Sequence, residues 1–214
     1  MIRNTDFDKK AYHTVKRACD ITGSAALIAL TAPVSLAVAL MIKAESPGPV
    51  IFIHKRTGLN GHSIRIYKFR SMRIGSEKVE EVLNDEELEK YYQEYKLHDD
   101  PRITETGRFL RRISLDELPQ LVNVIQGRMS LVGPRPVTAN ELLFYTEEDR
   151  KKILKVKPGL TGLWQVSDRN KTTYQSGLRQ KTELYYAEHA SLLLDLKIIL
   201  KTPAAVIRRS RGLG

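Results

Sequence analysis

Cysteine, aromatic residues and blocks of one charge are scarce in this sequence of 214 residues. The single cysteine, Cys19, excludes an internal disulfide and fits a reducing compartment. The five histidines lack metal-ligand spacing, and neither a Walker A loop nor a glycine-rich dinucleotide fingerprint is present. Because aromatics make up only 7% of the chain and no Lys/Arg block occurs, we do not expect nucleic acid as a partner.

Positive charge, in contrast, is abundant and dispersed. The formal net charge is +10, which indicates an acidic partner such as anionic lipid or a phosphorylated substrate. The length suits one domain with a normal hydrophobic core, with room for an appendage.

One apolar segment departs from the pattern of a soluble domain. Residues 21–42 carry no formal charge, and as a helix they would extend about 33 Å, enough for the ~30 Å hydrocarbon core of a bilayer. Pro33 lies near the middle and disfavours helix at Ala32, so we expect a membrane break at Ala32-Pro33.

The charges on both sides of this segment favour a re-entrant helix. Basic residues precede and follow it, and a helix that dips into the membrane and returns keeps both groups on the cytoplasmic face (Arg3, Lys9, Lys10, Lys16 and Arg17 before; Lys43, Lys55, Arg56 and Arg65 after). A kinked single span, a buried helix of a soluble protein and a signal peptide remain alternatives. The signal peptide is disfavoured because the apolar run is too long.

The remainder predicts a polar, mostly helical domain with one β-hairpin. Residues 50–53 and 63–67 read as two strands joined by a glycine-containing turn. Further helices are expected over 76–97, from Ser114 to Gly127, from the Thr138-Glu141 capping box to 156, and over 172–188 and 192–207. The last is apolar with a basic end, which fits either a core helix or a helix lying on a membrane.

The stretch Ser114-Leu115-Asp116-Glu117-Leu118-Pro119 contains the strongest candidate site. Ser114 and Glu117 fit a helix capping box, a purely structural role. Pro119 instead favours a helix that begins near Asp116, which would place this carboxylate at the positive end of the helix. Arg112, with Arg111 beside it, is then expected to lower the pKa of Asp116. A positioned carboxylate next to a bound phosphate is a competent nucleophile.

Two other basic residues are candidates for contacts with phosphate. Arg135 lies between Pro134 and Pro136, which restrict the backbone and limit where the guanidinium can go. Lys68 follows the predicted hairpin. Each has an ordinary structural interpretation when taken alone.

In combination, the motifs of this chain resemble those of the bacterial sugar transferase family, the monotopic phosphoglycosyl transferases. They cover residues from about 12 to 208 in the order typical of that family. The matching stretches are Val15-Lys16-Arg17-Ala18-Cys19-Asp20, Ile66-Tyr67-Lys68-Phe69-Arg70-Ser71-Met72, Asp100-Pro101-Arg102-Ile103-Thr104, Gly107-Arg108-Phe109-Leu110-Arg111, Ser114 to Leu121, Met129 to Pro136, Lys157 to Val166, and Arg169-Asn170.

The resemblance implies an enzyme that transfers a hexose 1-phosphate from a UDP-sugar to polyprenyl (undecaprenyl) phosphate and releases UMP. It implies Mg²⁺ as cofactor, Asp116 as the nucleophile that forms a covalent phosphosugar intermediate, and Glu117 as a partner that helps to hold the metal. Lys68, Arg112, Arg135 and Arg169 would contact substrate phosphate. The wording of the motifs favours galactose or glucose, with an N-acetylated hexosamine as the alternative.

The resemblance also implies an organisation and a place in the cell. We expect a re-entrant helix in 1–43, a small α/β (α+β, mostly helical) catalytic domain in 44–190, and an interfacial helix with a basic tail in 191–214. The location would be the bacterial inner membrane, with inner-membrane lipid as a partner and the active site on the cytoplasmic face. A homodimer is left open, and the absence of a further N-terminal membrane region suggests a minimal catalytic form.

Two positions depart from the family pattern. Ala32 replaces the serine that many members have before the proline, and Asp168 occupies a position where glycine is common. A competing interpretation is a non-catalytic scaffold that binds anionic lipid, in which the two carboxylates only cap a helix.

Overall fold

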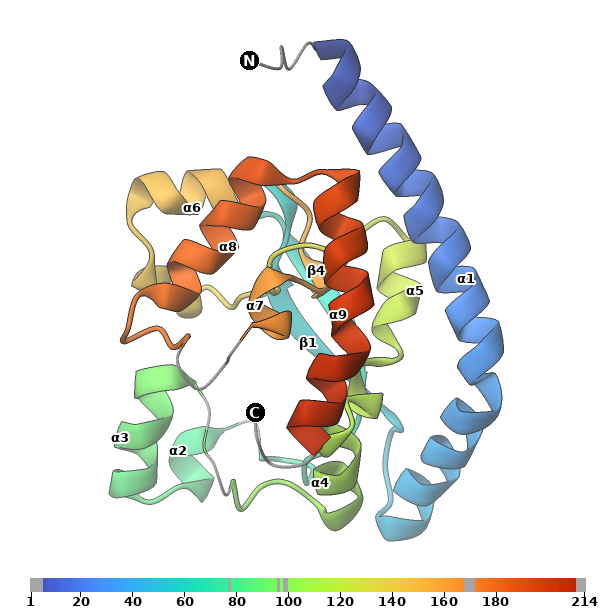
Figure 1. Ribbon diagram of the computed structural model, residues 1–214. Coiled ribbons are helices and arrows are strands. Elements are labelled where there is room, and N and C mark those ends of the chain that lie inside the picture. The colour runs from blue at the N-terminus through green and yellow to red at the C-terminus, as the bar shows by residue number, and fades with distance from the viewer. Residues whose placement is uncertain (1–5, 77, 96, 98–99, 168–171, 211–214) are drawn as a thin grey trace.

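A computed structural model describes residues 6–76, 78–95, 97, 100–167 and 172–210, with the side chains of 6–10 and 94 left aside. The elements are α1 (Asp6–Glu45), β1 (Ile51–Thr57), η1 (Leu59–Gly61), β2 (Ser63–Phe69), α2 (Val79–Val82), α3 (Asp85–Glu94), α4 (Glu105–Arg112), η2 (Leu115–Glu117), α5 (Gln120–Ile125), β3 (Ser130–Val132), η3 (Glu141–Phe144), α6 (Glu147–Ile153), β4 (Gly159–Thr161), α7 (Leu163–Val166), α8 (Leu178–His189) and α9 (Leu192–Ser210). Figure 1 shows helices surrounding a small amount of sheet.

The expected class, a mostly helical domain with a β-hairpin, is confirmed. β1 and β2 form an antiparallel pair, in which Ile51 faces Phe69 and Thr57 faces Ser63. The sequence did not predict a second, parallel pair, in which Ser130 of β3 lies opposite Gly159 of β4.

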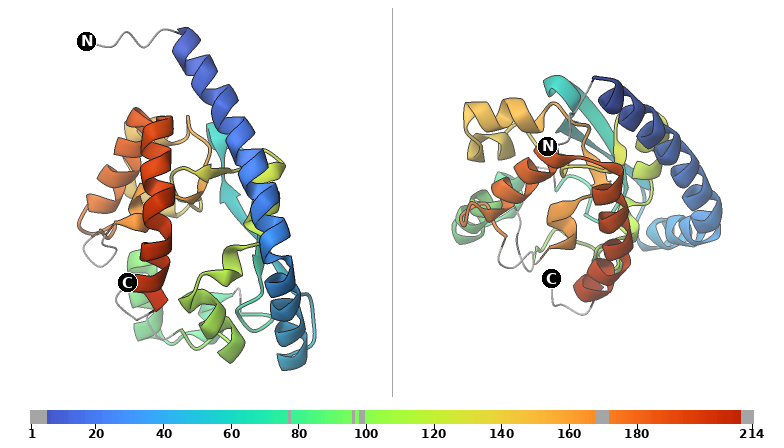
Figure 2. Two further views of the ribbon diagram at one scale, coloured as in Figure 1. Left: turned by 45° about the vertical axis from the view of Figure 1, so that its right-hand side comes forward. Right: turned by 45° about the horizontal axis from the view of Figure 1, so that its top comes forward.

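The helix α1 runs through Pro33 without interruption for 40 residues. The expected division into two helices at Ala32-Pro33 is therefore absent. The helix bends instead, as the views in Figures 1 and 2 show. A proline inside a helix removes one i→i−4 hydrogen bond and is a common cause of such a bend. Of the described helices, α1 alone is long and apolar enough to cross a membrane, judged by length and composition.

The first half of α1 is tied to the body by charged side chains. Lys16 forms a 2.8 Å ion pair with Asp195 of α9. Arg17 donates to the carbonyls of Val124 and Ile125 at the end of α5, at 2.6 and 2.7 Å. Asp20, which is buried, accepts hydrogen bonds from the Ser130 hydroxyl and the Leu131 amide in β3.

The far end of α1 is also tied down. The buried guanidinium of Arg70 donates to the carbonyls of Ile42, Ser46 and Pro47, which lie in the last turn of α1 and just beyond it. Val38 and Ile42 pack with Phe69 and Leu110 in one apolar cluster, against which Leu115 and Leu118 also pack. The turn that carries Asp116 thus packs against an apolar cluster to which the second half of α1 contributes.

Several predicted helices are shorter or divided. The helix expected over 76–97 is two helices, α2 and α3, because Asn84 forms a complete capping box with Glu87 and starts a new one. The Ser76 hydroxyl donates to the Arg73 carbonyl. The Thr138-Glu141 reciprocal bonds are present, but the segment to 156 divides into η3 and α6, since Thr146 caps α6. The helix expected over 172–188 begins only at Leu178, as α8.

Candidate functional site

The Asp116-Glu117 pair lies in a short 3₁₀ turn rather than at the start of a long helix. Ser114, with φ 61°, is left-handed and makes no side-chain cap, so the predicted Ser114-Glu117 capping box is wrong. α5 begins at Gln120, directly after Pro119, so the expected start of this helix near Asp116 is wrong, and the proline precedes the first turn. Because α5 is only six residues long and starts at Gln120, its dipole gives little support to Asp116.

The Asp116 carboxyl is buried, with 4% of the residue exposed, and its Oδ1 has no hydrogen-bond partner among the described residues. Burial raises its pKa above the ordinary value, and Lys68, Arg111 and Arg209 oppose that rise. The expected lowering of the Asp116 pKa is therefore wrong in direction, because desolvation outweighs the nearby cations. Such a group is poised to take up a positive or electrophilic partner.

Glu117 has the opposite environment. Its Oε1 accepts a 3.0 Å hydrogen bond from Lys68 Nζ and lies 3.9 Å from the Arg135 guanidinium. Although burial works against ionisation, these cations lower the pKa of Glu117 to about 2. Two adjacent carboxyls whose pKa values are driven apart are suited to different roles in one reaction.

A pocket opens beside Glu117. It is lined mainly by residues of β1, β2 and the segments around Arg135 and Gly159, whereas Asp116 lies outside the lining. The lining residues are Arg56, Ile66, Lys68, Glu117, Gln120, Arg135, Pro136, Gly159, Leu160 and Gln165. Three cations and one carboxylate thus face one opening, which suits a polyanionic ligand such as a diphosphate.

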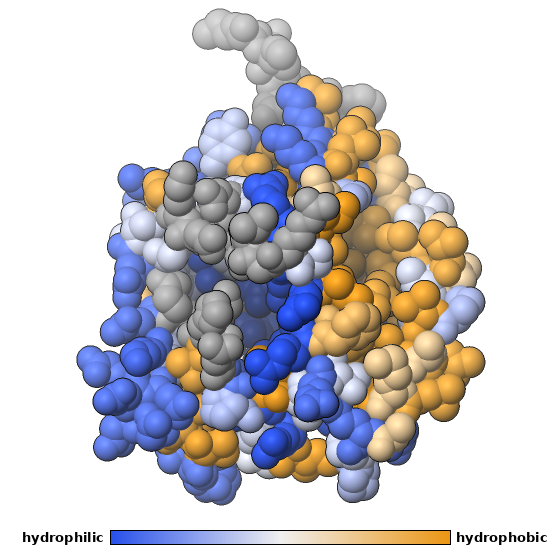
Figure 3. All heavy atoms as spheres, turned by 60° about the horizontal axis from the view of Figure 1, so that its bottom comes forward, coloured by the Kyte–Doolittle hydropathy of each residue, from blue (hydrophilic) through white to orange (hydrophobic). Residues whose placement is uncertain are grey.

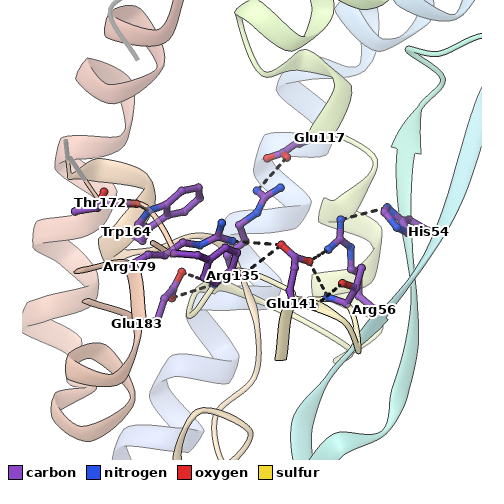
Figure 4. Close-up of polar contacts among 11 residues, drawn as sticks. His54, Arg56, Glu117, Arg135, Glu141, Trp164, Thr172, Arg179 and Glu183 are labelled. Carbon is purple, nitrogen blue, oxygen red and sulfur yellow. Dashed lines mark hydrogen bonds and ion pairs between the residues drawn. The ribbon is translucent and has the colours of Figure 1, made fainter. Parts of the chain in front are cut away.

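Arg135 is held on both sides, as Figure 4 shows. Its backbone amide donates to both carboxyl oxygens of Glu183, at 3.2 and 3.1 Å. Its guanidinium points to Glu117 and lies 5.6 Å from the centre of the Trp164 ring. The Pro-Arg-Pro segment therefore presents a guanidinium to the pocket.

The structure brings some of the predicted residues together and separates others. Lys68 and Arg135 both contact Glu117. Arg112 is exposed, whereas Arg111 acts electrostatically on Asp116 and donates to the Ser71 hydroxyl at 2.8 Å. Arg169 and Asp168 lie outside the described residues. Ala32 and Pro33 are on the exposed face of α1.

Sequence reasoning missed a second charged cluster behind Arg135. Glu141 forms ion pairs with Arg56 and, at 3.5 Å, with Arg179, whose guanidinium lies 4.2 Å from the Trp164 ring centre and 3.9 Å from that of Tyr174. Figure 4 shows Glu141 between the two guanidiniums. The capping-box pattern of Thr138 and Glu141 was recognised, but it gave no signal for partners 85 and 38 residues away.

The two carboxyls supply oxygens of the kind that a magnesium ion would take. Carboxylate oxygens are the ligands that Mg²⁺ prefers, and this ion usually takes only one or two from protein and the rest from phosphates and water. The unpartnered Oδ1 of Asp116 is such a donor. The described residues contain no cluster of three or more His, Cys, Asp or Glu that would form an all-protein metal site.

Comparison with known proteins identifies the family. Residues 11–209 match the bacterial sugar transferase family, which covers most of the chain. The chain therefore belongs to the bacterial sugar transferase family, and the resemblance recognised from its motifs is confirmed.

Curated relatives share about two fifths of its residues. One is the undecaprenyl-phosphate galactose phosphotransferase of Salmonella typhimurium, 40% identical over 94% of this chain and 42% of the relative. Another is the exopolysaccharide production protein ExoY of Rhizobium meliloti, 42% identical over 92% of this chain and 87% of the relative. The UDP-glucose:undecaprenyl-phosphate glucose-1-phosphate transferase of Escherichia coli is 40% identical over 88% of this chain and 39% of the relative. The chain thus spans less than half the length of two of these relatives.

Proposed function

We propose that this protein transfers a hexose 1-phosphate from a UDP-sugar to undecaprenyl phosphate, forming a polyprenyl-diphosphate-sugar and UMP. The observation that carries this proposal is the buried Asp116 carboxyl beside Glu117, whose Oδ1 has no partner among the described residues, with Lys68, Arg111 and Arg135 around the pair. The two named transferases among the relatives support the same reaction, and it would start the assembly of a bacterial polysaccharide.

The reaction would proceed in two displacements at one phosphorus. In the first, an oxygen of Asp116 attacks the β-phosphorus of the UDP-sugar, the bond to the bridging oxygen breaks, and UMP leaves with that electron pair. In the second, a phosphate oxygen of the lipid attacks the same phosphorus, and the Asp116 carboxylate is released. This ping-pong order lets a nucleotide and a long lipid use one site in turn.

The surrounding residues would stabilise the charges that move in these steps. Lys68 and Arg135 face the pocket beside Glu117, so they are placed to bind the diphosphate, and Arg112 and Arg169 stay candidate phosphate ligands. Asp116 and Glu117 would hold Mg²⁺, which when bound would offset negative charge on the phosphates. Because Asp116 is desolvated, its carboxylate would be a stronger nucleophile once ionised.

Attachment to the membrane is proposed from the distribution of apolar side chains. In Figure 3, hydrophobic atoms gather on the side where α1 lies. Large hydrophobic residues are exposed along the middle of α1 (Leu27, Leu30, Val34, Leu36, Leu40 and Met41) and along α9 (Leu192, Leu193, Leu196, Ile199 and Leu200). The bent α1 would enter the inner membrane and return, α9 would lie at the interface, and the site would face the cytoplasm. The division into 1–43, 44–190 and 191–214 follows from this arrangement.

The sugar is proposed to be galactose or glucose, in keeping with the names of two relatives, and an N-acetylated hexosamine is the alternative. The test is UMP release from a panel of UDP-sugars, with undecaprenyl phosphate and Mg²⁺, by the purified protein in detergent. The expected result is release with UDP-galactose or UDP-glucose that disappears with EDTA. Release with none of the sugars, together with salt-sensitive binding to anionic vesicles, would favour the scaffold instead. Light scattering of the same sample would test whether the protein forms a homodimer.

A further inference from the structure

The last turn of α9 reaches the turn that carries Asp116. Arg209 Nη1 donates a 3.1 Å hydrogen bond to the Ser114 hydroxyl, across 95 positions of sequence. Arg209 is partly buried, whereas the preceding Arg208 is exposed. One of two adjacent arginines is therefore directed into the body of the protein and the other into its surroundings.

The residue that Arg209 contacts has an unusual backbone conformation. Ser114 has φ 61° and ψ 19°, a left-handed conformation that residues other than glycine seldom adopt. It stands directly before the 3₁₀ turn and makes no cap with its side chain. A bond from outside the turn thus helps to hold a strained residue two positions before Asp116.

Arg209 also adds charge where the two carboxyls lie. After Lys68 and Arg135, it is the next cation that favours the ionised form of Glu117, and it acts on Asp116 and Arg111 as well. The site therefore contains a cation that belongs to the C-terminal helix, far in sequence from the motif around Asp116.

We propose that Arg209 is a positioning residue of this active site, which holds the Ser114-Asp116 turn in place through the Ser114 hydroxyl and so links the seating of α9 to catalysis. This inference rests on the proposed transferase function. The helix that supplies Arg209 exposes Leu193, Leu196 and Leu200 on another face. A surface that binds these leucines therefore also holds the helix that positions the Arg209 guanidinium.

The experiment compares Arg209→Ala with Arg208→Ala, which removes the same charge one residue away. With UDP-sugar, undecaprenyl phosphate and Mg²⁺, Arg209→Ala is expected to lower kcat about 10- to 100-fold more than Arg208→Ala, because small displacements of a reacting group are costly. The KM for UDP-sugar should stay within about twofold, since Arg209 acts through the turn and not on the substrate. Binding to vesicles of anionic lipid should be equal for the two variants.

A double-mutant cycle identifies the bond. Ser114→Ala should also reduce kcat, but less than Arg209→Ala because the Arg209 charge remains, and the double variant should be no worse than Arg209→Ala alone. Multiplying effects would overturn the proposal, and so would a raised KM with unchanged kcat. If Arg209→Ala does not fold, Ser114→Ala tests the same bond from the other side. A wild-type protein without activity would refute the proposed function, whereas an active wild type with equal losses in the two arginine variants would refute only this inference.

Discussion

Two buried carboxyls of this protein, Asp116 and Glu141, both lie among guanidiniums, yet their surroundings differ. Both oxygens of Glu141 are engaged, by Arg56 and the Thr138 amide on one side and by Tyr174 and Arg179 on the other. Asp116 leaves Oδ1 without a partner among the described residues. A carboxyl with all its bonds made holds a structure together, whereas one with a bond left open is available for chemistry.

The largest effect is expected from Asp116→Asn. This change keeps the shape of the side chain but removes the nucleophile, so UMP release should fall by roughly 10³-fold or more. The melting temperature should stay the same or rise. Burial disfavours the charged form of Asp116 and so raises its pKa, and the neutral amide of asparagine avoids this cost. Activity within tenfold of wild type would refute the catalytic role of Asp116.

Glu141→Ala should give the opposite result, a large loss of stability. It leaves Arg56 and Arg179 buried without their carboxylate, which typically costs about 3–5 kcal/mol. The control is Glu147→Ala, which removes the exposed Glu147–Lys151 pair of α6 and should cost less than about 0.5 kcal/mol. Thermal unfolding followed by circular dichroism measures both. Equal melting temperatures of the two variants would show that the contacts of Glu141 do not stabilise the fold.

A smaller and pH-dependent effect is expected for Glu183, which accepts hydrogen bonds from the Arg135 backbone amide. Burial raises its pKa from 4.5 to about 7, against the Arg135 amide and Arg179, which lower it. Because the folded-state pKa is raised, the stability present below pH 4.5 is lost as the pH rises through 7. Glu183→Gln stays neutral and should avoid this loss.

The measurement is the free energy of unfolding of both proteins from pH 5 to pH 8. The difference, Gln variant minus wild type, should increase with pH and reach roughly 2–3 kcal/mol in free energy of unfolding near pH 8. A difference that is constant across this range would show that Glu183 does not titrate in it.

The features that could be predicted from the sequence are those that depend on neighbouring residues. The hairpin was predictable because its apolar residues and glycine turn are local, and the Asp116-Glu117 pair because it lies in a contiguous motif. The Glu141–Arg56 and Arg209–Ser114 contacts join residues 85 and 95 positions apart, for which no local pattern exists. The Ser114-Glu117 capping box does not form because the backbone of Ser114 is left-handed. The raised pKa of Asp116 was not predicted because it results from burial, which depends on the whole fold.

The attachment of α1 at two places has a consequence for the position of the active site. Lys16, Arg17 and Asp20 hold its first half and Arg70 holds its last turn, so the helix is fastened to the body on both sides of its exposed middle. If the exposed middle of α1 is embedded in a lipid layer, the tilt of that helix sets the height and the orientation of the pocket beside Glu117. A lipid substrate would then reach the site by diffusing laterally in the membrane. A change in bilayer thickness would change the height of the site relative to the lipid head groups.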